Sequence, residues 1–192
     1  TDLRIHSQKV SISVQNTKWT KGSSMKEIFA DKDVVVIGNA LSLNEKKLES
    51  LIGENTLTCA FNRGVERFKP DVAFLSIADG WNTEVDIGNA VSIHVSSQGR
   101  PSLTADYTIP MRVINKLKPH VGYRPSSGCI ANAFLSQRSL GIKSVTLIGF
   151  DFKQTPTYYN QKISPADEPH DYVRERKFTI SYFIHERNYN II

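Results

Sequence analysis

Short, nearly continuous apolar runs alternate with amphipathic stretches along this chain. Four such runs are bounded by turn-forming residues and a fifth is weaker: residues 34–37, 57–61, 72–77 and 145–148, then 91–95. Runs of this length and character are typical of strands that are buried on both faces of a parallel sheet. Residues 10–14 instead alternate between apolar and polar positions, as an edge strand does.

Helical patterns lie between the apolar runs, at residues 44–52, 109–117, 126–140 and 170–185. In the clearest of them, Ser126 follows Pro125 as an N-cap, Ile130 and Phe134 share one face, and Gly141 closes the carboxyl end. Strands that alternate with helices predict an α/β fold, with a Rossmann-like, mostly parallel sheet and helices on both of its faces.

Composition limits the classes of protein to consider. The chain has 192 residues, 40% of them hydrophobic and 22% charged, which predicts one globular domain over residues 1–192. The formal net charge of +5 favours an anionic partner. Residues 151–192 hold six basic and six acidic side chains, so the excess lies before residue 151. Because no run of like charges marks a basic arm, we expect no nucleic-acid partner, while a homo-oligomer is compatible with the composition.

The two cysteines and the lack of long apolar segments indicate the cellular compartment of the protein. Cys59 and Cys129 are far apart, in apolar surroundings, without a CxxC motif or histidines at zinc-finger spacing. They are interpreted as buried thiols in a reducing compartment. No stretch is long and apolar enough to span a membrane, and the first residues do not have the pattern of a signal peptide. The sequence thus predicts a cytoplasmic protein without a transmembrane segment.

Polar residues that could bind a ligand follow the predicted strands, where open parallel sheets bind theirs. Gly38 and Asn39 follow the first strand, and Asn62 follows the second. No GxGxxG or GxxxxGK[ST] motif is present, so a dinucleotide fold and a P-loop are both disfavoured. The Gly38 turn could hold a phosphate through its backbone N–H groups, or it could be a tight turn only.

A second candidate anion site precedes the helix at 126–140. The segment supplies two hydroxyls, from Ser126 and Ser127, and Gly128 permits a ligand to approach the backbone closely. It also lies at the positive end of the helix dipole. The alternative is that Ser126 caps the helix and Gly128 packs against a neighbour.

The segment before the last helix has the composition of a functional loop. Residues 154–169 contain three prolines and no clear period, which predicts a lid at about residues 152–170. His170 follows this segment and could act as a general base, because a histidine titrates near neutral pH. It could also be a solvated residue at the start of the helix.

These motifs occur in a recognisable order. They are Gly38-Asn39-Ala40-Leu41-Ser42-Leu43, Asn62, Ser126-Ser127-Gly128, Leu140-Gly141 and Ile148-Gly149-Phe150-Asp151-Phe152. Together they resemble the bacterial sialyltransferases of glycosyltransferase family 42. A pterin pyrophosphokinase-like group of Rossmann-like proteins is similar as well.

The resemblance implies an enzyme that binds a CMP-activated sugar and transfers it to a glycan or other hydroxyl acceptor by direct displacement. It also implies that the enzyme needs neither a metal nor a cofactor. The resemblance implies that Asn39 and Asn62 contact the nucleotide and that Ser127 holds the cytidine or the sugar. The expected substrate site also includes Gly38, Ser42, Ser126 and Gly128. The resemblance also implies that Tyr159 donates a hydrogen bond to the departing phosphate and that His170 is the general base.

The chain departs from the family pattern at three positions. Ala40 and Leu41 stand where the family has glycine and proline, and Lys153 replaces a tyrosine after the GxDF strand. The Lys153 cation could neutralise a leaving phosphate, so Lys153 is counted with the catalytic residues. Two alternatives stay open: a pterin or nucleotide pyrophosphokinase-like enzyme, with Asp79 and Asp151 as metal candidates, and a non-catalytic nucleotide-binding module.

Overall fold

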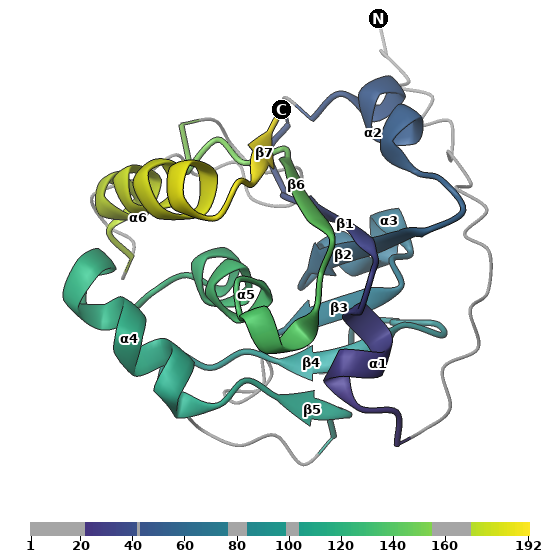
Figure 1. Ribbon diagram of the computed structural model, residues 1–192, viewed down its shortest axis with the longest axis horizontal. Helices are drawn as coiled ribbons and strands as arrows, with labels where there is room; N and C mark the ends of the chain where they lie inside the picture. Colours follow the sequence, from purple (N-terminus) through teal and green to yellow (C-terminus); the bar gives the residue numbers. More distant parts are fainter. Residues whose placement is uncertain (1–21, 42, 77–83, 99–103, 155–169) are drawn as a thin grey trace, which may run out of the picture.

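One sheet of seven parallel strands is the framework of the protein (Figure 1). We describe it from a computed structural model, which covers residues 22–41, 43–76, 84–98, 104–154 and 170–192. The strand order is β5-β4-β3-β2-β1-β6-β7. The bounds are β1 (Asp33–Ile37), β2 (Thr56–Phe61), β3 (Val72–Leu75), β4 (Val91–His94), β5 (Tyr107–Thr108), β6 (Ser144–Ile148) and β7 (Asn190–Ile191). The predicted α/β, Rossmann-like fold is confirmed.

The five central strands follow the predicted apolar runs closely. Within β1, Val34 and Val36 pack on one face of the sheet while Val35 and Ile37 pack on the other, so the whole run is apolar. The run at 72–77 forms a strand only as far as Leu75. The edge strands β5 and β7 were not predicted, because each has two residues and none of these is buried. The predicted strand at 10–14 lies outside the described residues.

Helices connect most of the strands, whereas β3, β4 and β5 follow one another without a helix among the described residues. Their bounds are α1 (Met25–Phe29), α2 (Glu45–Leu51), α3 (Gly64–Phe68), α4 (Met111–Val121), α5 (Ser127–Leu135) and α6 (Tyr172–Phe178), with a 3-10 turn η1 (Arg138–Leu140) and a π-helical stretch η2 (Thr179–Glu186). Asn44 and Ser126 are N-caps, as predicted, and accept the N–H groups of Lys47 and Cys129. The predicted helix 126–140 divides into α5 and η1, and the one at 170–185 into α6 and η2. The short helices α1 and α3 were not predicted.

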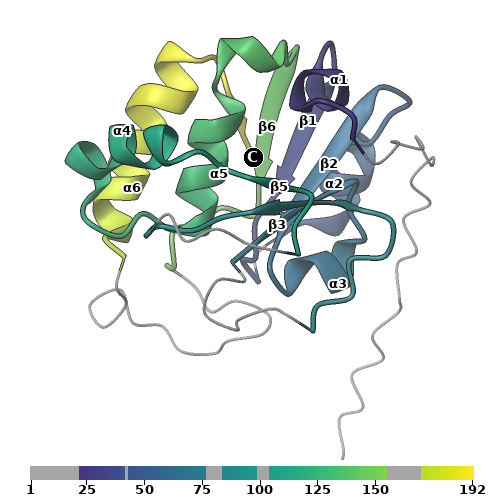
Figure 2. The ribbon, with the colours of Figure 1, turned by 90° about the horizontal axis from the view of Figure 1, so that it is seen from below.

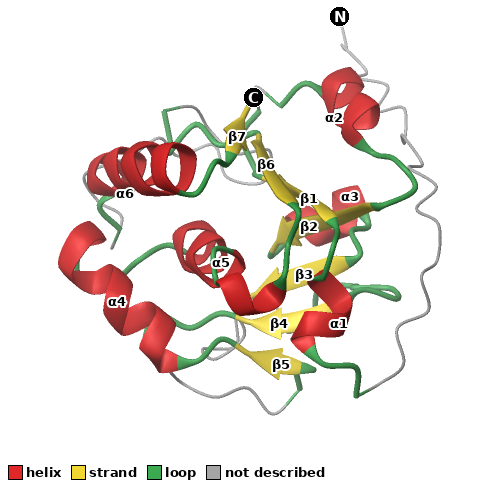
Figure 3. Cartoon of the chain, viewed as in Figure 1, coloured by secondary structure: helices red, strands yellow, loops and turns green. Residues whose placement is uncertain are grey.

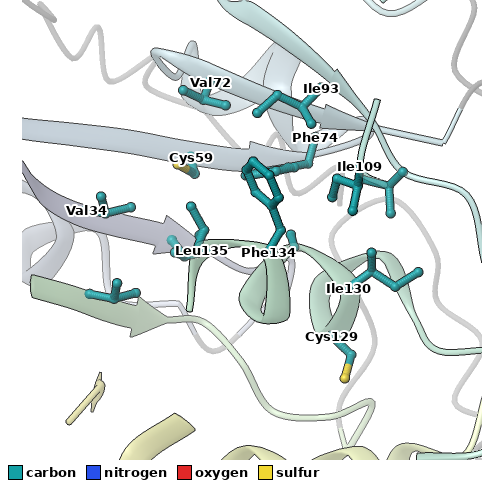
Figure 4. Close-up of a cluster of buried hydrophobic side chains, with 14 of the residues drawn as sticks. Val34, Cys59, Val72, Phe74, Ile93, Ile109, Cys129, Ile130, Phe134 and Leu135 are labelled. Atoms are coloured by element: carbon teal, nitrogen blue, oxygen red, sulfur yellow. The ribbon is translucent and has the colours of Figure 1, made fainter. Parts of the chain in front are cut away.

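Two layers of helices cover the sheet. Helices α4, α5 and α6 lie on one side, and α2 and α3 on the other (Figure 2). Figure 4 shows the larger core, where Phe134 of α5 packs edge-on against Phe74 of β3. Cys59 and Cys129 are free and buried, as predicted, and burial raises the pKa of both thiols.

From β1 the sheet extends on one side through β2, β3, β4 and β5, and on the other side through β6 and β7. The chain therefore crosses to the other side of β1 between β5 and β6. Ligands of open parallel sheets bind outside the carboxyl ends of the strands at such a switch point. Here a Cβ on Gly38 would lie 2.1 Å from the carbonyl oxygen of Gly149. Gly149 has a φ of +72°, and a Cβ on it would lie 2.7 Å from the Leu43 side chain. The close approach of the two backbones therefore requires glycine at position 38, and the left-handed φ together with the Leu43 contact favours glycine at position 149.

This contact gives a first prediction. Gly38→Ala should lower the free energy of unfolding by about 3 kcal/mol or more, because the new methyl group meets backbone that cannot move independently. Gly53→Ala is the matched control, since its Cβ would lie 3.7 Å from the nearest atom, the Thr56 hydroxyl. Urea denaturation of both variants tests this. Equal stability of the two would show that the β1 and β6 ends can separate at little cost.

Candidate functional site

Phe150 is the centre around which the predicted site residues gather. It follows Gly149 at the end of β6, and its ring meets that of Phe61 edge-on, with 5.9 Å between centroids. A Cβ on Gly128 would lie 3.3 Å from the same ring. The fold therefore brings the turn after β1, the end of β2 and the start of α5 to one edge of the sheet. This is the arrangement that the sequence predicted for a ligand site.

The turn after β1 is held against β6 by its own backbone. The Gly38 N–H donates to the Ile148 carbonyl over 2.7 Å, and the Ala40 N–H donates to the Gly149 carbonyl over 3.2 Å. These two N–H groups are thus used within the protein, which accords with the tight-turn interpretation of Gly38. Asn39 lies between them and is half-buried. Ser42 lies outside the described residues.

Asn62 joins the ends of two strands. Its φ of +47° is in the left-handed region, which asparagine tolerates better than most residues. Its N–H donates to the Phe74 carbonyl over 3.0 Å, and its Oδ1 accepts the Ser76 N–H over 3.0 Å. Asn62 thereby fixes the β3 end beside the β2 end. Its contact with a nucleotide stays a prediction.

The start of α5 is already occupied by an acidic side chain from α6. The Ser126 N–H donates to Oε1 of Glu175 over 2.6 Å, and the Ser126 hydroxyl donates to Oε2 over 2.5 Å. Glu175 is only 2% exposed. Burial raises its pKa to about 7, while the two hydrogen bonds from Ser126 act in the opposite direction. Ser126, one of the predicted anion-binding residues, is therefore already hydrogen-bonded to the Glu175 carboxyl group.

Sequence reasoning missed Glu175, although a signal for it exists. Glu175, Thr179 and Phe183 recur at a spacing of four residues, and all three are buried. An acidic residue that shares one helix face with a core phenylalanine is expected to direct its carboxyl group toward the interior. The helix pattern alone does not say which partner it meets.

His170 lies beside the segment that leads into α5. Its Nδ1 is 2.7 Å from the carbonyl oxygen of Arg124, two residues before Ser126. Because a carbonyl only accepts, Nδ1 donates, and in the neutral ring the lone pair is then on Nε2. Next to it, Asp171 caps α6 by accepting the Arg174 N–H over 3.0 Å. The structure thus places His170 against the segment that leads into α5, two residues before Ser126.

The segment after β6 is described only in part. Phe152 and Lys153 both have positive φ, of +54° and +62°. The Lys153 N–H donates to Oδ1 of Asp151 over 3.1 Å, which closes a tight turn after the strand. Tyr159 lies outside the described residues, as does the predicted lid from 155 to 169.

The described residues also bear on the alternative functions. Among the described residues, no three or more His, Cys, Asp and Glu side chains are grouped so that they could hold a metal ion. Asp79, a metal candidate of the pyrophosphokinase alternative, lies outside the described residues. No helix in the described part of the chain is long and apolar enough to cross a membrane.

Comparison with known proteins found neither a protein family that matches the chain nor a significant match among curated proteins. The resemblance to family 42 thus rests on the short motifs and on their order along the chain.

The environment of Glu175 predicts a pH dependence of stability. The ordinary pKa of a glutamate is 4.5, and the pKa of Glu175 in the folded protein is about 7. At pH values between these two, Glu175 holds a proton in the folded protein that it has released in the unfolded chain. The free energy of unfolding should therefore fall as pH rises through this window, by about 3 kcal/mol for this group. Urea denaturation at pH 5, 6, 7 and 8 measures the decline.

Glu175→Gln should remove this decline, because glutamine does not titrate and can still hydrogen-bond to Ser126. Glu49→Gln, at an exposed position on α2, is the matched control and should keep it. A decline of the same size in Glu175→Gln would assign the pH dependence to another group.

Proposed function

We propose that this protein is a glycosyltransferase that moves a sugar from a nucleotide-activated donor to an acceptor hydroxyl. CMP-sialic acid is the nearest precedent for the donor. The observation that carries the proposal is the hydrogen bond from His170 to the Arg124 carbonyl, which holds a histidine beside the start of α5. This region lies at the carboxyl edge of the sheet, next to the residues after β1, β2 and β6.

The proposed reaction is a direct displacement. The acceptor oxygen forms a bond to the anomeric carbon of the sugar, and the bond from that carbon to the phosphate oxygen of CMP breaks. His170 accepts the acceptor proton at Nε2, since Nδ1 is bound to the Arg124 carbonyl. CMP leaves with the electron pair, and Lys153 and Tyr159 stabilise its phosphate in this proposal.

The donor would lie across the edge between β1, β2 and α5. Asn39 and Asn62 offer amide groups that can both donate and accept hydrogen bonds. Because Ser126 is bound to Glu175, the serine that serves the donor is Ser127, whose hydroxyl forms no hydrogen bond within the described part of the chain. Gly128 has no side chain, which lets the Phe150 ring pack against the start of α5 beside the proposed donor site.

Nucleotide binding is the first test. CMP should bind measurably in isothermal titration, and Asn62→Ala should weaken it at least fivefold, whereas UMP and GMP serve as controls for the base. Asn55→Ala, at an exposed amide between α2 and β2, is the matched control for the substitution. If none of the three nucleotides binds, the donor site is not where we propose it.

Donor hydrolysis tests the base. His170→Ala should lower the rate of CMP-sialic acid hydrolysis at least tenfold, because the proposed reaction relies on His170 to accept the proton of the attacking oxygen. His185→Ala, at an exposed position on η2, should leave the rate unchanged.

Two other outcomes would select the alternatives. Binding of CMP without any turnover would favour a non-catalytic nucleotide-binding module. Magnesium-dependent consumption of ATP would favour a pyrophosphokinase-like enzyme.

A further inference from the structure

A cavity of about 670 Å³ lies among α4, α5 and α6, on the side of the sheet that these helices cover. Its walls are α4 and η2, and the carboxyl end of α5 forms its floor. Figure 3 shows α4, α5 and α6 packed together on one side of the sheet. The stretch η2 directly follows α6 in the chain. We call this cavity the α4–η2 groove. Its volume is within the range of about 300–1,000 Å³ that small-molecule sites occupy.

Basic side chains line the groove in a row. Arg112, Lys116 and His120 follow one another at a spacing of four residues on α4, and all three are exposed. Arg138 lines the groove from η1. Like charges at this spacing destabilise a helix by about 0.2–0.5 kcal/mol per pair, so folding alone does not favour the arrangement.

The protein supplies little negative charge to balance this row. The ion pairs within the described residues do not include Arg112, Lys116 or Arg138. Among the described residues that line the groove, Glu186 is the one acid. Arg187 is already used structurally, because its guanidinium donates to the Ser136 carbonyl. The α4–η2 groove therefore presents cations to which an anion from solution could bind.

Aromatic rings form a second, independent feature of the groove. Phe178 stacks on His120 with centroids 5.1 Å apart and on Tyr182 with centroids 5.2 Å apart. The planes differ by only 22° and 16°, so three rings form one nearly parallel stack. A planar ring of a ligand can extend such a stack.

The backbone that carries two of these rings is unusual. Phe178 ends α6, and Tyr182 lies in the π-helical stretch that follows, where the Arg187 N–H donates to the Tyr182 carbonyl over 3.0 Å. A π-helical turn widens a helix locally and is frequent at functional sites. It gives the rings and the cations of α4 a common cavity.

We propose that the α4–η2 groove binds a nucleoside diphosphate or triphosphate. The base extends the stack of His120, Phe178 and Tyr182 at its Tyr182 end, and the phosphates meet Arg112, Lys116 and Arg138. A guanidinium matches a phosphate in a bidentate geometry, and a lysine adds a point charge. The site is separate from the donor site of the proposed function and does not depend on it.

Titration of the full chain with ADP, in the presence of EDTA, tests the proposal. ADP should bind, and the double variant Arg112→Glu, Lys116→Glu should weaken it at least tenfold, because repulsion replaces two attractions. Tyr182→Ala should weaken it at least fivefold, since stacking on an aromatic side chain contributes about 1–3 kcal/mol per base. Inorganic pyrophosphate, which lacks a ring, should bind more weakly than ADP.

The controls separate this site from the surface charge and from the donor site. Lys46→Glu, Lys47→Glu makes the same change of charge at exposed positions on α2 and should leave ADP binding unchanged. ADP should also bind to protein saturated with CMP. The proposal is overturned if ADP does not bind, if the groove and control variants bind it equally, or if pyrophosphate binds as tightly as ADP.

Discussion

The close approach of Gly38 to Gly149 is the constraint on which the candidate site depends. It holds the end of β1 against the end of β6 at the point where the strand order reverses. Phe150 follows directly, so its ring lies between Phe61 and the start of α5. A side chain at Gly38 would separate the two strand ends and move this whole edge.

Glu175 extends the same arrangement to the last helix. Its carboxyl group binds the N–H and the hydroxyl of Ser126, so α6 is attached to α5 at the carboxyl edge of the sheet. At the opposite end of α5, Arg187 donates to the Ser136 carbonyl. These two polar contacts set the position of η2, which forms one wall of the groove, and the position of His170, which precedes α6.

The two proposed sites use different chemistry on one scaffold. At the carboxyl edge the proposed polar groups are amides, hydroxyls, one histidine and Lys153, which suits a ligand with one phosphate that is recognised mainly by directed hydrogen bonds. In the α4–η2 groove the groups are cations and stacked rings, which suits a ligand with several negative charges. Arg112, Lys116 and Arg138 belong to the first 150 residues, where the chain carries its excess of positive charge. Part of this excess positive charge therefore lies in the α4–η2 groove.

The sequence by itself determined the central strands and two helix caps. The run Val34–Val35–Val36–Ile37 is apolar because both faces of β1 are covered, and Asn44 and Ser126 bind N–H groups three residues ahead. Such features depend on neighbouring residues, so a local pattern contains them. Only the tertiary structure decided that Glu175 meets Ser126, or that the rings of η2 face the cations of α4. Those contacts join segments far apart in the chain, and packing of the helices on the sheet, rather than any local preference, brings them together.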